Sequence, residues 1–177
     1  MGAHVELKAW EQAEAHFREL DQDQGRVHYD RDMFNCELAL NIVGIGTLFS
    51  CSGHLDALPA FPYITIVPQR EVAGLVPRYI SIMETQPLSQ GALAVKHAIA
   101  KAMSELGQHL LSLLNGFYEE RQTPLPCRLV IQANGVGSYT LVNQGAIVGL
   151  LSDLETLRAY QDEFMAFGEY LKKSIWE

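Results

Sequence analysis

The sequence has few basic residues, and this shortage bears on whether the protein can bind nucleic acids. Its 177 residues include 13 Lys and Arg against 21 Asp and Glu, which gives a formal net charge of −8. Non-specific affinity for nucleic acids comes mostly from cationic side chains that displace counterions from phosphates. The charge balance therefore disfavours an extended nucleic-acid-binding face.

Cysteines are also scarce, and long apolar runs are missing. Cys36, Cys51 and Cys127 lie far apart and form no CxxC pair, so they indicate no disulfide framework and favour a reducing compartment. No apolar run is long enough for a transmembrane helix. The first residues lack the cationic start and the apolar stretch of a signal peptide. We therefore expect a cytoplasmic protein with no membrane partner.

The sequence is rich in apolar residues arranged in regular patterns. Hydrophobic residues make up 48% of the chain and charged residues 19%, a balance typical of globular proteins rather than disordered ones. A chain of this length can bury one substantial core. We therefore predict a single domain that spans residues 1–177.

Four stretches carry apolar residues at intervals of three and four, which is typical of amphipathic helices. The expected helices are 7–20, a second one capped by Asp30 or Asp32, a long one within 88–121, and one that follows the capping-box pattern of residues 152–155. Gly44 or Gly46 is expected to end the second helix, because glycine readily adopts the backbone conformation of a helix C-cap.

Six short segments rich in β-branched and aromatic residues predict strands. They are 45–49, 63–67, 79–83, 128–133, 138–142 and 146–151. Short strands with hairpin-like turns, separated by long amphipathic helices, indicate an α+β fold with a mainly antiparallel sheet covered by helices. The predicted order of elements is α-α-β-β-β-α-β-β-β-α.

One stretch, Thr47 to His54, interrupts this pattern because an apolar run stops in a cluster of small, polar and reactive side chains. It lies at the end of the predicted strand 45–49. Gly53 can take a positive φ, which would allow a tight turn. Ser50, Ser52 and the backbone N–H groups of such a turn could hold a carboxylate or a phosphate. The stretch is therefore the predicted site.

Two other chemistries fit the same residues. Cys51 could act as a nucleophile, with His54 as its base or as the partner of its thiolate. Cys51 and His54 also have the C-x-x-H spacing of zinc ligands. The other obvious metal donors are His28, Cys36, Asp56 and Cys127. A structural alternative stands beside both chemistries, because free cysteines are mostly buried and serine-rich turns often satisfy their own backbone. We assign no metal site.

The segment that contains this stretch resembles two groups of proteins. Its pattern of Gly25-Arg26-Val27, Leu40-Asn41 and Thr47 to His54 is similar to the N-terminal pattern of the wybutosine-synthesis methyltransferase family. The Ser-Cys-Ser-Gly-His motif followed by Pro62-Tyr63-Ile64 resembles small uncharacterised bacterial proteins more closely. Together the two resemblances cover residues 25–67. His54 stands where the methyltransferase family has Arg, so a fixed cation is replaced by a ring that is often neutral.

The resemblance implies an α+β fold with a ligand pocket beside the turn, to which Ser50, Cys51, Ser52 and Gly53 contribute by match. In the methyltransferase family the ligand is S-adenosylmethionine and the substrate is a modified guanosine in tRNA. The acidic net charge and the departure at His54 disfavour tRNA as the substrate here.

Three functions follow as hypotheses. The leading hypothesis is that a small ligand, anionic or nucleotide-like, binds at residues 50–54. The second is an enzyme, either an S-adenosylmethionine-dependent methyltransferase or a thiol enzyme that uses Cys51 and His54. The third is a structural protein without catalytic activity, which forms a homodimer through the amphipathic helices at the two ends of the chain. The sequence leaves open whether the protein is an enzyme.

Overall fold

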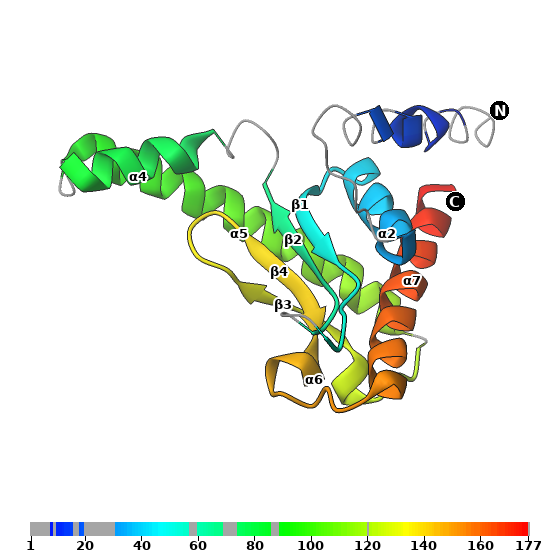
Figure 1. Ribbon diagram of the computed structural model, residues 1–177. Coiled ribbons are helices and arrows are strands. Elements are labelled where there is room, and N and C mark those ends of the chain that lie inside the picture. The colour runs from blue at the N-terminus through cyan, green and yellow to red at the C-terminus, as the bar shows by residue number, and fades with distance from the viewer. Residues whose placement is uncertain are drawn as a thin grey trace.

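Four short β-rich segments pair into one antiparallel sheet in the computed structural model (Figure 1). The strands are β1 (Gly46–Cys51), β2 (Tyr63–Val67), β3 (Leu129–Ala133) and β4 (Tyr139–Asn143). Their order across the sheet is β1-β2-β4-β3, so β1 and β3 form the edges. The structure describes residues 8, 10–15, 18–19, 31–56, 60–68, 74–85, 89–119 and 121–176.

Helices pack against this sheet and against one another. They are α2 (Arg31–Ile42), α4 (Leu75–Thr85), α5 (Gln90–Glu119), the 3₁₀ turn η1 (Leu125–Cys127), α6 (Gln144–Ile147) and α7 (Leu154–Trp176). Helix α2 packs along α7, and α5 runs behind the sheet and carries α4 on its N-terminal half (Figure 1). The α+β class with an antiparallel sheet is therefore confirmed.

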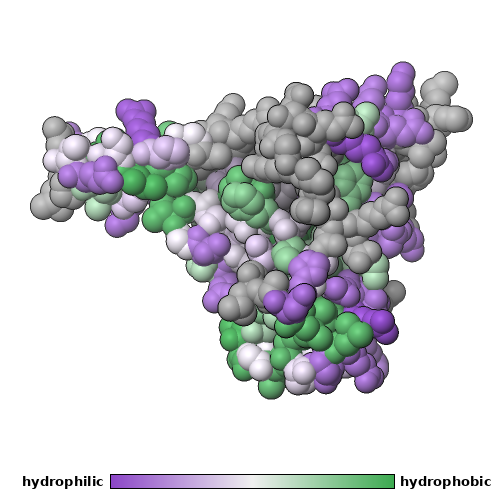
Figure 2. All heavy atoms as spheres, viewed as in Figure 1, coloured by the Kyte–Doolittle hydropathy of each residue, from purple (hydrophilic) through white to green (hydrophobic). Residues whose placement is uncertain are grey.

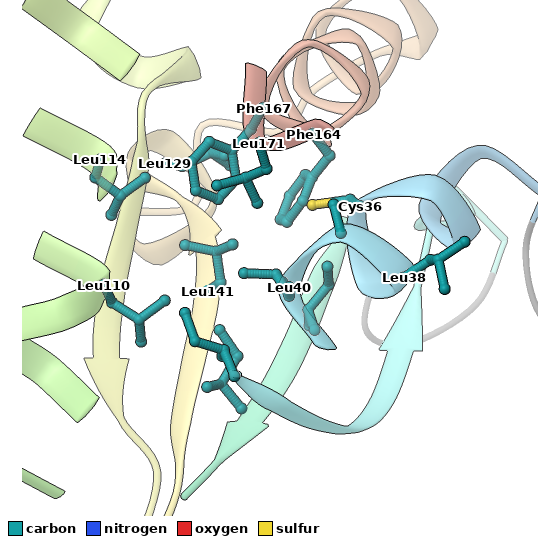
Figure 3. Packing of buried hydrophobic residues seen from close by; sticks show 14 of the residues in the cluster. Cys36, Leu38, Leu40, Leu110, Leu114, Leu129, Leu141, Phe164, Phe167 and Leu171 are labelled. Carbon is teal, nitrogen blue, oxygen red and sulfur yellow. The ribbon is translucent and has the colours of Figure 1, made fainter. Parts of the chain in front are cut away.

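The main core lies between the helices and one face of the sheet. Ile64 of β2 is paired directly with Leu141 of β4, so both side chains point to the same face. In Figure 3, Leu141 lies between Leu110 of α5 and Leu40 of α2, with side chains of α7 beside them. These side chains are fully buried, and burial of each contributes about 1.5–3 kcal/mol to folding.

The predicted strand 79–83 is wrong, because these residues lie within helix α4. Val76, Tyr79 and Ile82 are half-buried and recur at intervals of three, which turns them toward α5 in a helix but not in a strand. Pro77 falls in the first turn of α4, where its missing N–H removes no helical hydrogen bond. Packing against α5 therefore overrides the local β preference of the isoleucines.

The predicted strand 146–151 is also wrong. Residues 144–147 form the single helical turn α6, which Gly149 closes at a φ of 75°. The N–H of Leu150 donates to the carbonyl of Gly145 at 2.8 Å, as in a Schellman motif. The sheet consequently has four strands instead of six, and the predicted order of elements does not match.

The other predicted helices agree with α2, α5 and α7, and the structure adds detail at their ends. Helix α2 ends in a Schellman motif in which Gly44 has a φ of 85° and the N–H of Ile45 donates to the carbonyl of Leu40 at 2.8 Å. At the start of α7 the cap is Asp153, whose Oδ1 accepts the N–H of Thr156 at 2.8 Å. The cap thus lies one residue later than the capping-box pattern predicts.

Parts of the predicted first helix, and Asp30 as a cap, lie outside the described residues. Within 8, 10–15 and 18–19 the backbone is helical. Trp10 is buried in the main core, and the ammonium of Lys172 lies 4.7 Å from its ring centroid. In the described part of the chain, no helix has the length and apolar character that crossing a membrane requires.

Candidate ligand-binding site

The C-terminal end of α2 sets the position of β1 and therefore of the predicted site. The side-chain amide of Asn41 donates from Nδ2 both to the carbonyl of Glu37 and to Oγ1 of Thr47, each at 2.8 Å. These bonds join the last turn of α2 to the second residue of β1. The strand is thereby held against the core before it reaches the reactive residues.

Strand β1 contains a bulge that changes which of its side chains reach the surface. Thr47 pairs with Ile66 and Phe49 pairs with Thr65, so Leu48 is the extra residue. Leu48 and Phe49 are 42% and 57% exposed. The bulge therefore presents two large apolar side chains on an edge strand.

The turn after β1 requires glycine at position 53. Gly53 has a φ of 82°, a conformation that side-chain-bearing residues adopt only at a cost. A Cβ on this residue would lie 2.6 Å from the carbonyl oxygen of Ala60 and 2.8 Å from the nitrogen of Pro62. The predicted positive φ is confirmed, and the close return of residues 60–62 adds a steric reason that the sequence does not reveal.

Two hydrogen bonds hold the turn in place. The carbonyl of Ser52 accepts a bond from Nε2 of Gln161 in α7 at 3.0 Å, and Sγ of Cys51 accepts the N–H of Gly53 at 3.3 Å. Ser52 is only 3% exposed. The turn is thus fixed by helix α7, a contact that sequence reasoning missed because 109 residues separate the partners.

The five predicted site residues do not point in one direction. Ser50 pairs with Ile64, on the core face of the sheet, whereas Cys51 pairs with Tyr63, on the opposite face. Ser52 and Gly53 are buried in the turn, and His54 is exposed. The structure therefore brings together Cys51 with Tyr63, and it separates Ser50 from them.

The neighbourhood of Cys51 is partly apolar. Tyr63 lies between Cys51 of β1 and Val142 of β4 in one row across the sheet. Burial raises the pKa of Tyr63, and the nearby Cys51 raises it further. Its phenol is therefore neutral at physiological pH and can donate a hydrogen bond. Phe49 lies two residues before Cys51 on the same side of β1. The result is a thiol flanked by two aromatic rings on the face away from the core.

The described residues offer little support for metal binding at the turn. They contain no group of three or more His, Cys, Asp or Glu side chains that could hold a metal ion. Cys36 is fully buried in the main core, and this burial raises the pKa of its thiol. His28 lies outside the described residues.

A second buried cluster lies at the end of the sheet where the turn is found. Val142, Ala146 and Tyr160 form it, and Phe61 of the β1–β2 connection packs against it. The side-chain amide of Asn143 donates to the carbonyl of Cys127 at 2.8 Å and ties η1 to this cluster. The turn, α6, η1 and the start of α7 consequently meet at one end of the molecule (Figure 1).

A cavity of about 390 Å³ opens beside this cluster, between η1 and the first turns of α7. Its lining consists of Pro126, Cys127, Leu150, Asp153, Glu155, Thr156, Ala159 and Tyr160. Sequence reasoning missed the cavity. The available signal is the apolar run 146–151 between two turn-forming segments, whose composition predicts a strand.

No protein-family model, curated protein or solved structure matches the chain. The resemblances to the methyltransferase family and to the small bacterial proteins therefore stay predictions.

Proposed function

We propose that the protein binds a small ligand at the turn within residues 50–54, where Cys51 and the exposed His54 lie beside the sheet face that carries Tyr63. The observation that supports this most is the direct pairing of Cys51 with Tyr63 beside the exposed ring of Phe49. Binding sites combine apolar and aromatic walls with a few oriented polar groups. This arrangement offers both, on a turn that α7 holds rigid.

The residues favour a flat ligand with a polar or anionic group. The rings of Phe49 and Tyr63 can stack against a planar, base-like moiety, since aromatic faces gain about 0.5–1.5 kcal/mol from stacking beyond burial alone. The exposed imidazole of His54 can donate a hydrogen bond to an anionic group. A nucleoside or nucleotide-like compound combines these features.

Calorimetry and thermal-shift measurements with adenosine, adenosine monophosphate, S-adenosylmethionine and S-adenosylhomocysteine test the proposal. We expect at least one to bind, and we expect Phe49→Ala to weaken that binding by about tenfold, which corresponds to roughly 1.4 kcal/mol. Leu111→Ala, an exposed leucine of α5, serves as the matched control. The absence of any binding, or equal affinity in Phe49→Ala and Leu111→Ala, contradicts the proposal.

The same panel separates the methyltransferase alternative from simple binding. Binding of S-adenosylmethionine and S-adenosylhomocysteine, without binding of adenosine monophosphate, would favour methyl transfer and justify a search for its substrate.

The thiol alternative is tested by alkylation of Cys51. A rate equal to that of an ordinary exposed thiol, at every pH, counts against a catalytic cysteine.

The homodimer alternative has less to support it. The expected contact surface was the pair of helices at the two ends of the chain, yet Trp10 is buried against the main core of the same molecule. Sedimentation at high concentration tests whether the remaining surfaces associate, and a strict monomer removes this alternative.

A further inference from the structure

Exposed aliphatic side chains gather around the cavity at the end of the molecule formed by η1, α6 and α7. Figure 2 shows a concentration of apolar residues there, over α6. We call this the aliphatic surface, and its exposed members are Leu125, Ile147, Val148, Leu150 and Leu154. Val148 alone is 66% exposed. Single exposed aliphatics are ordinary, but a contiguous group around a cavity is typical of an interaction site.

The elements that carry this surface are packed together, so its shape is fixed. Helix α6 packs against η1, and η1 packs against α7. The N–H of Leu150 donates to the carbonyl of Gly145, and the N–H of Gln144 donates to the carbonyl of Arg128, each at 2.8 Å. The aliphatic surface is therefore presented by a hydrogen-bonded framework.

The cavity inside this surface has a negative character. Its described lining includes the carboxylates of Asp153 and Glu155 and no Lys, Arg or His. The hydrogen bond from the backbone N–H of Thr156 lowers the pKa of Asp153 and so favours its carboxylate form. Two arginines near this end are engaged elsewhere, since Arg121 pairs with Glu163 at 3.0 Å and Arg128 lies over the ring of Tyr118. Arg158 of α7 is exposed and does not line the cavity.

We propose that the aliphatic surface docks a basic, apolar segment of another protein, which places an aliphatic side chain in the cavity and a Lys or Arg beside Asp153 and Glu155. The aliphatic residues extend beyond the cavity, so a small molecule would leave most of them in water. The two carboxylates select for a cation, because opposite charges across an interface are favourable and like charges are costly. An amphipathic helix with leucines on one side and lysines beside them has this chemistry.

A second copy of this chain is a poorer partner for the same surface. Each chain carries a net charge of −8, and a symmetric contact would bring the carboxylates of one copy toward those of the other. A basic segment meets the carboxylates of Asp153 and Glu155 instead. The proposal concerns residues 125–160 and does not depend on ligand binding at residues 50–54.

Binding of a fluorescein-labelled amphipathic peptide of Leu and Lys, measured by anisotropy with the full chain, tests the proposal. A peptide of the same length in which every Lys is replaced by Glu is the matched probe. We expect the Lys peptide to bind about tenfold or more tightly than the Glu peptide. No binding of the Lys peptide, or equal binding of the two, overturns the proposal.

Substitutions locate the contact. We expect Val148→Asp to weaken binding of the Lys peptide by about tenfold or more, and Leu111→Asp, an equally polar change at an exposed leucine of α5, to leave it unchanged. Glu155→Lys should weaken the Lys peptide and strengthen the Glu peptide, whereas Glu105→Lys on α5 should change neither. Thermal midpoints within a few degrees of the original protein confirm that the variants fold.

Three results would overturn the proposal even if a peptide binds. The first is that Val148→Asp and Leu111→Asp weaken binding of the Lys peptide equally. The second is an unchanged preference between the peptides in Glu155→Lys. The third is a dimer in sedimentation that Val148→Asp converts to a monomer, because the aliphatic surface would then be the contact between two copies of this chain. Loss of nucleotide binding in Phe49→Ala leaves all three results unaffected, so the two proposals fail independently.

Discussion

The two faces of the sheet differ in chemistry although the same strands supply both. On the core face, Ile64 and Leu141 are fully buried among side chains of α2, α5 and α7. On the opposite face, Tyr63 pairs with Cys51 of β1, and Thr65 pairs with Phe49 of β1. Strand alternation thus assigns the main core to one face and the candidate chemistry to the other, where the row of Cys51 and Tyr63 continues to Val142 of the second buried cluster. Changes on the two faces should therefore have separate consequences.

The largest loss of stability is expected when a large side chain that packs in the main core is truncated. Phe164 is fully buried in α7, so Phe164→Ala removes burial and leaves a cavity, which costs about 3–5 kcal/mol in the free energy of unfolding. Phe49→Ala on the other face should cost less than about 1 kcal/mol, because that ring is already exposed. Urea unfolding of both variants measures the difference. Similar losses would show that the two faces do not divide the roles in this way.

The next largest effect is expected in the turn that ends β1. Gly53→Ala meets both an unfavourable φ and the backbone of residues 60–62, and we expect it to destabilise the protein by roughly 2–4 kcal/mol. Gly135→Ala is the matched control, since Gly135 has a φ of 69° and nothing within 4 Å of an added Cβ. It should cost only about 1–2 kcal/mol. Equal losses in thermal or urea unfolding would mean that the close return of residues 60–62 is unimportant.

A smaller effect is expected at the ion pair between α7 and the segment after α5. Glu163 is buried and accepts hydrogen bonds from Arg121 at 3.0 Å and from Oγ1 of Thr123 at 3.1 Å. Glu163→Gln removes the charge, and we expect a loss of about 1–3 kcal/mol in urea unfolding. Glu105→Gln is the control, because its pair with Lys101 is exposed and 3.9 Å long. That variant should change stability by less than about 0.5 kcal/mol. A loss in Glu105→Gln as large as that in Glu163→Gln would contradict this ranking.

The smallest effect is expected at the cap of α7. Hydrogen bonds from the backbone of Thr156 lower the pKa of Asp153, so its carboxylate contributes stability above the ordinary pKa of aspartate. That contribution is lost as the pH falls through the lowered, folded-state pKa. Asp153→Asn should therefore have a slightly lower thermal midpoint than the original protein at neutral pH, and the gap should close in strong acid.

Asp162→Asn controls for the loss of charge alone, because Asp162 lies in the middle of α7. We expect it to leave the midpoint nearly unchanged at both pH values. A gap between the original protein and Asp153→Asn that stays constant with pH would show that the cap does not depend on the charge of residue 153.

Much of the fold could be predicted because it obeys local rules. The apolar spacing in residues 90–119 produces one long helix, and Gly44, one of the two glycines predicted to end the second helix, ends α2 at a φ of 85°. The segment 63–67 forms a strand with the predicted bounds. Each of these features depends on residues that are neighbours in the chain, so the pattern carries the information.

The candidate site was predictable only in its location along the chain. Cys51 and His54 could be selected from residue type, but the partner of Cys51 across the sheet and the bond from Gln161 to Ser52 join distant segments. The bulge at Leu48 also changes which side chains of β1 reach the surface. Without the register, a sequence cannot show which reactive side chains share a face.

Local patterns alone determine the long helices, the central strands and the positive φ of Gly53. The packed structure decides that residues 79–83 are helical, since α5 offers a surface that only a helix can cover at that spacing. It also decides that Ser50 and Cys51 face opposite sides of the sheet, and that the aliphatic residues after β4 stay on the surface. Backbone preferences act over a few residues, whereas burial depends on what the rest of the chain places opposite them.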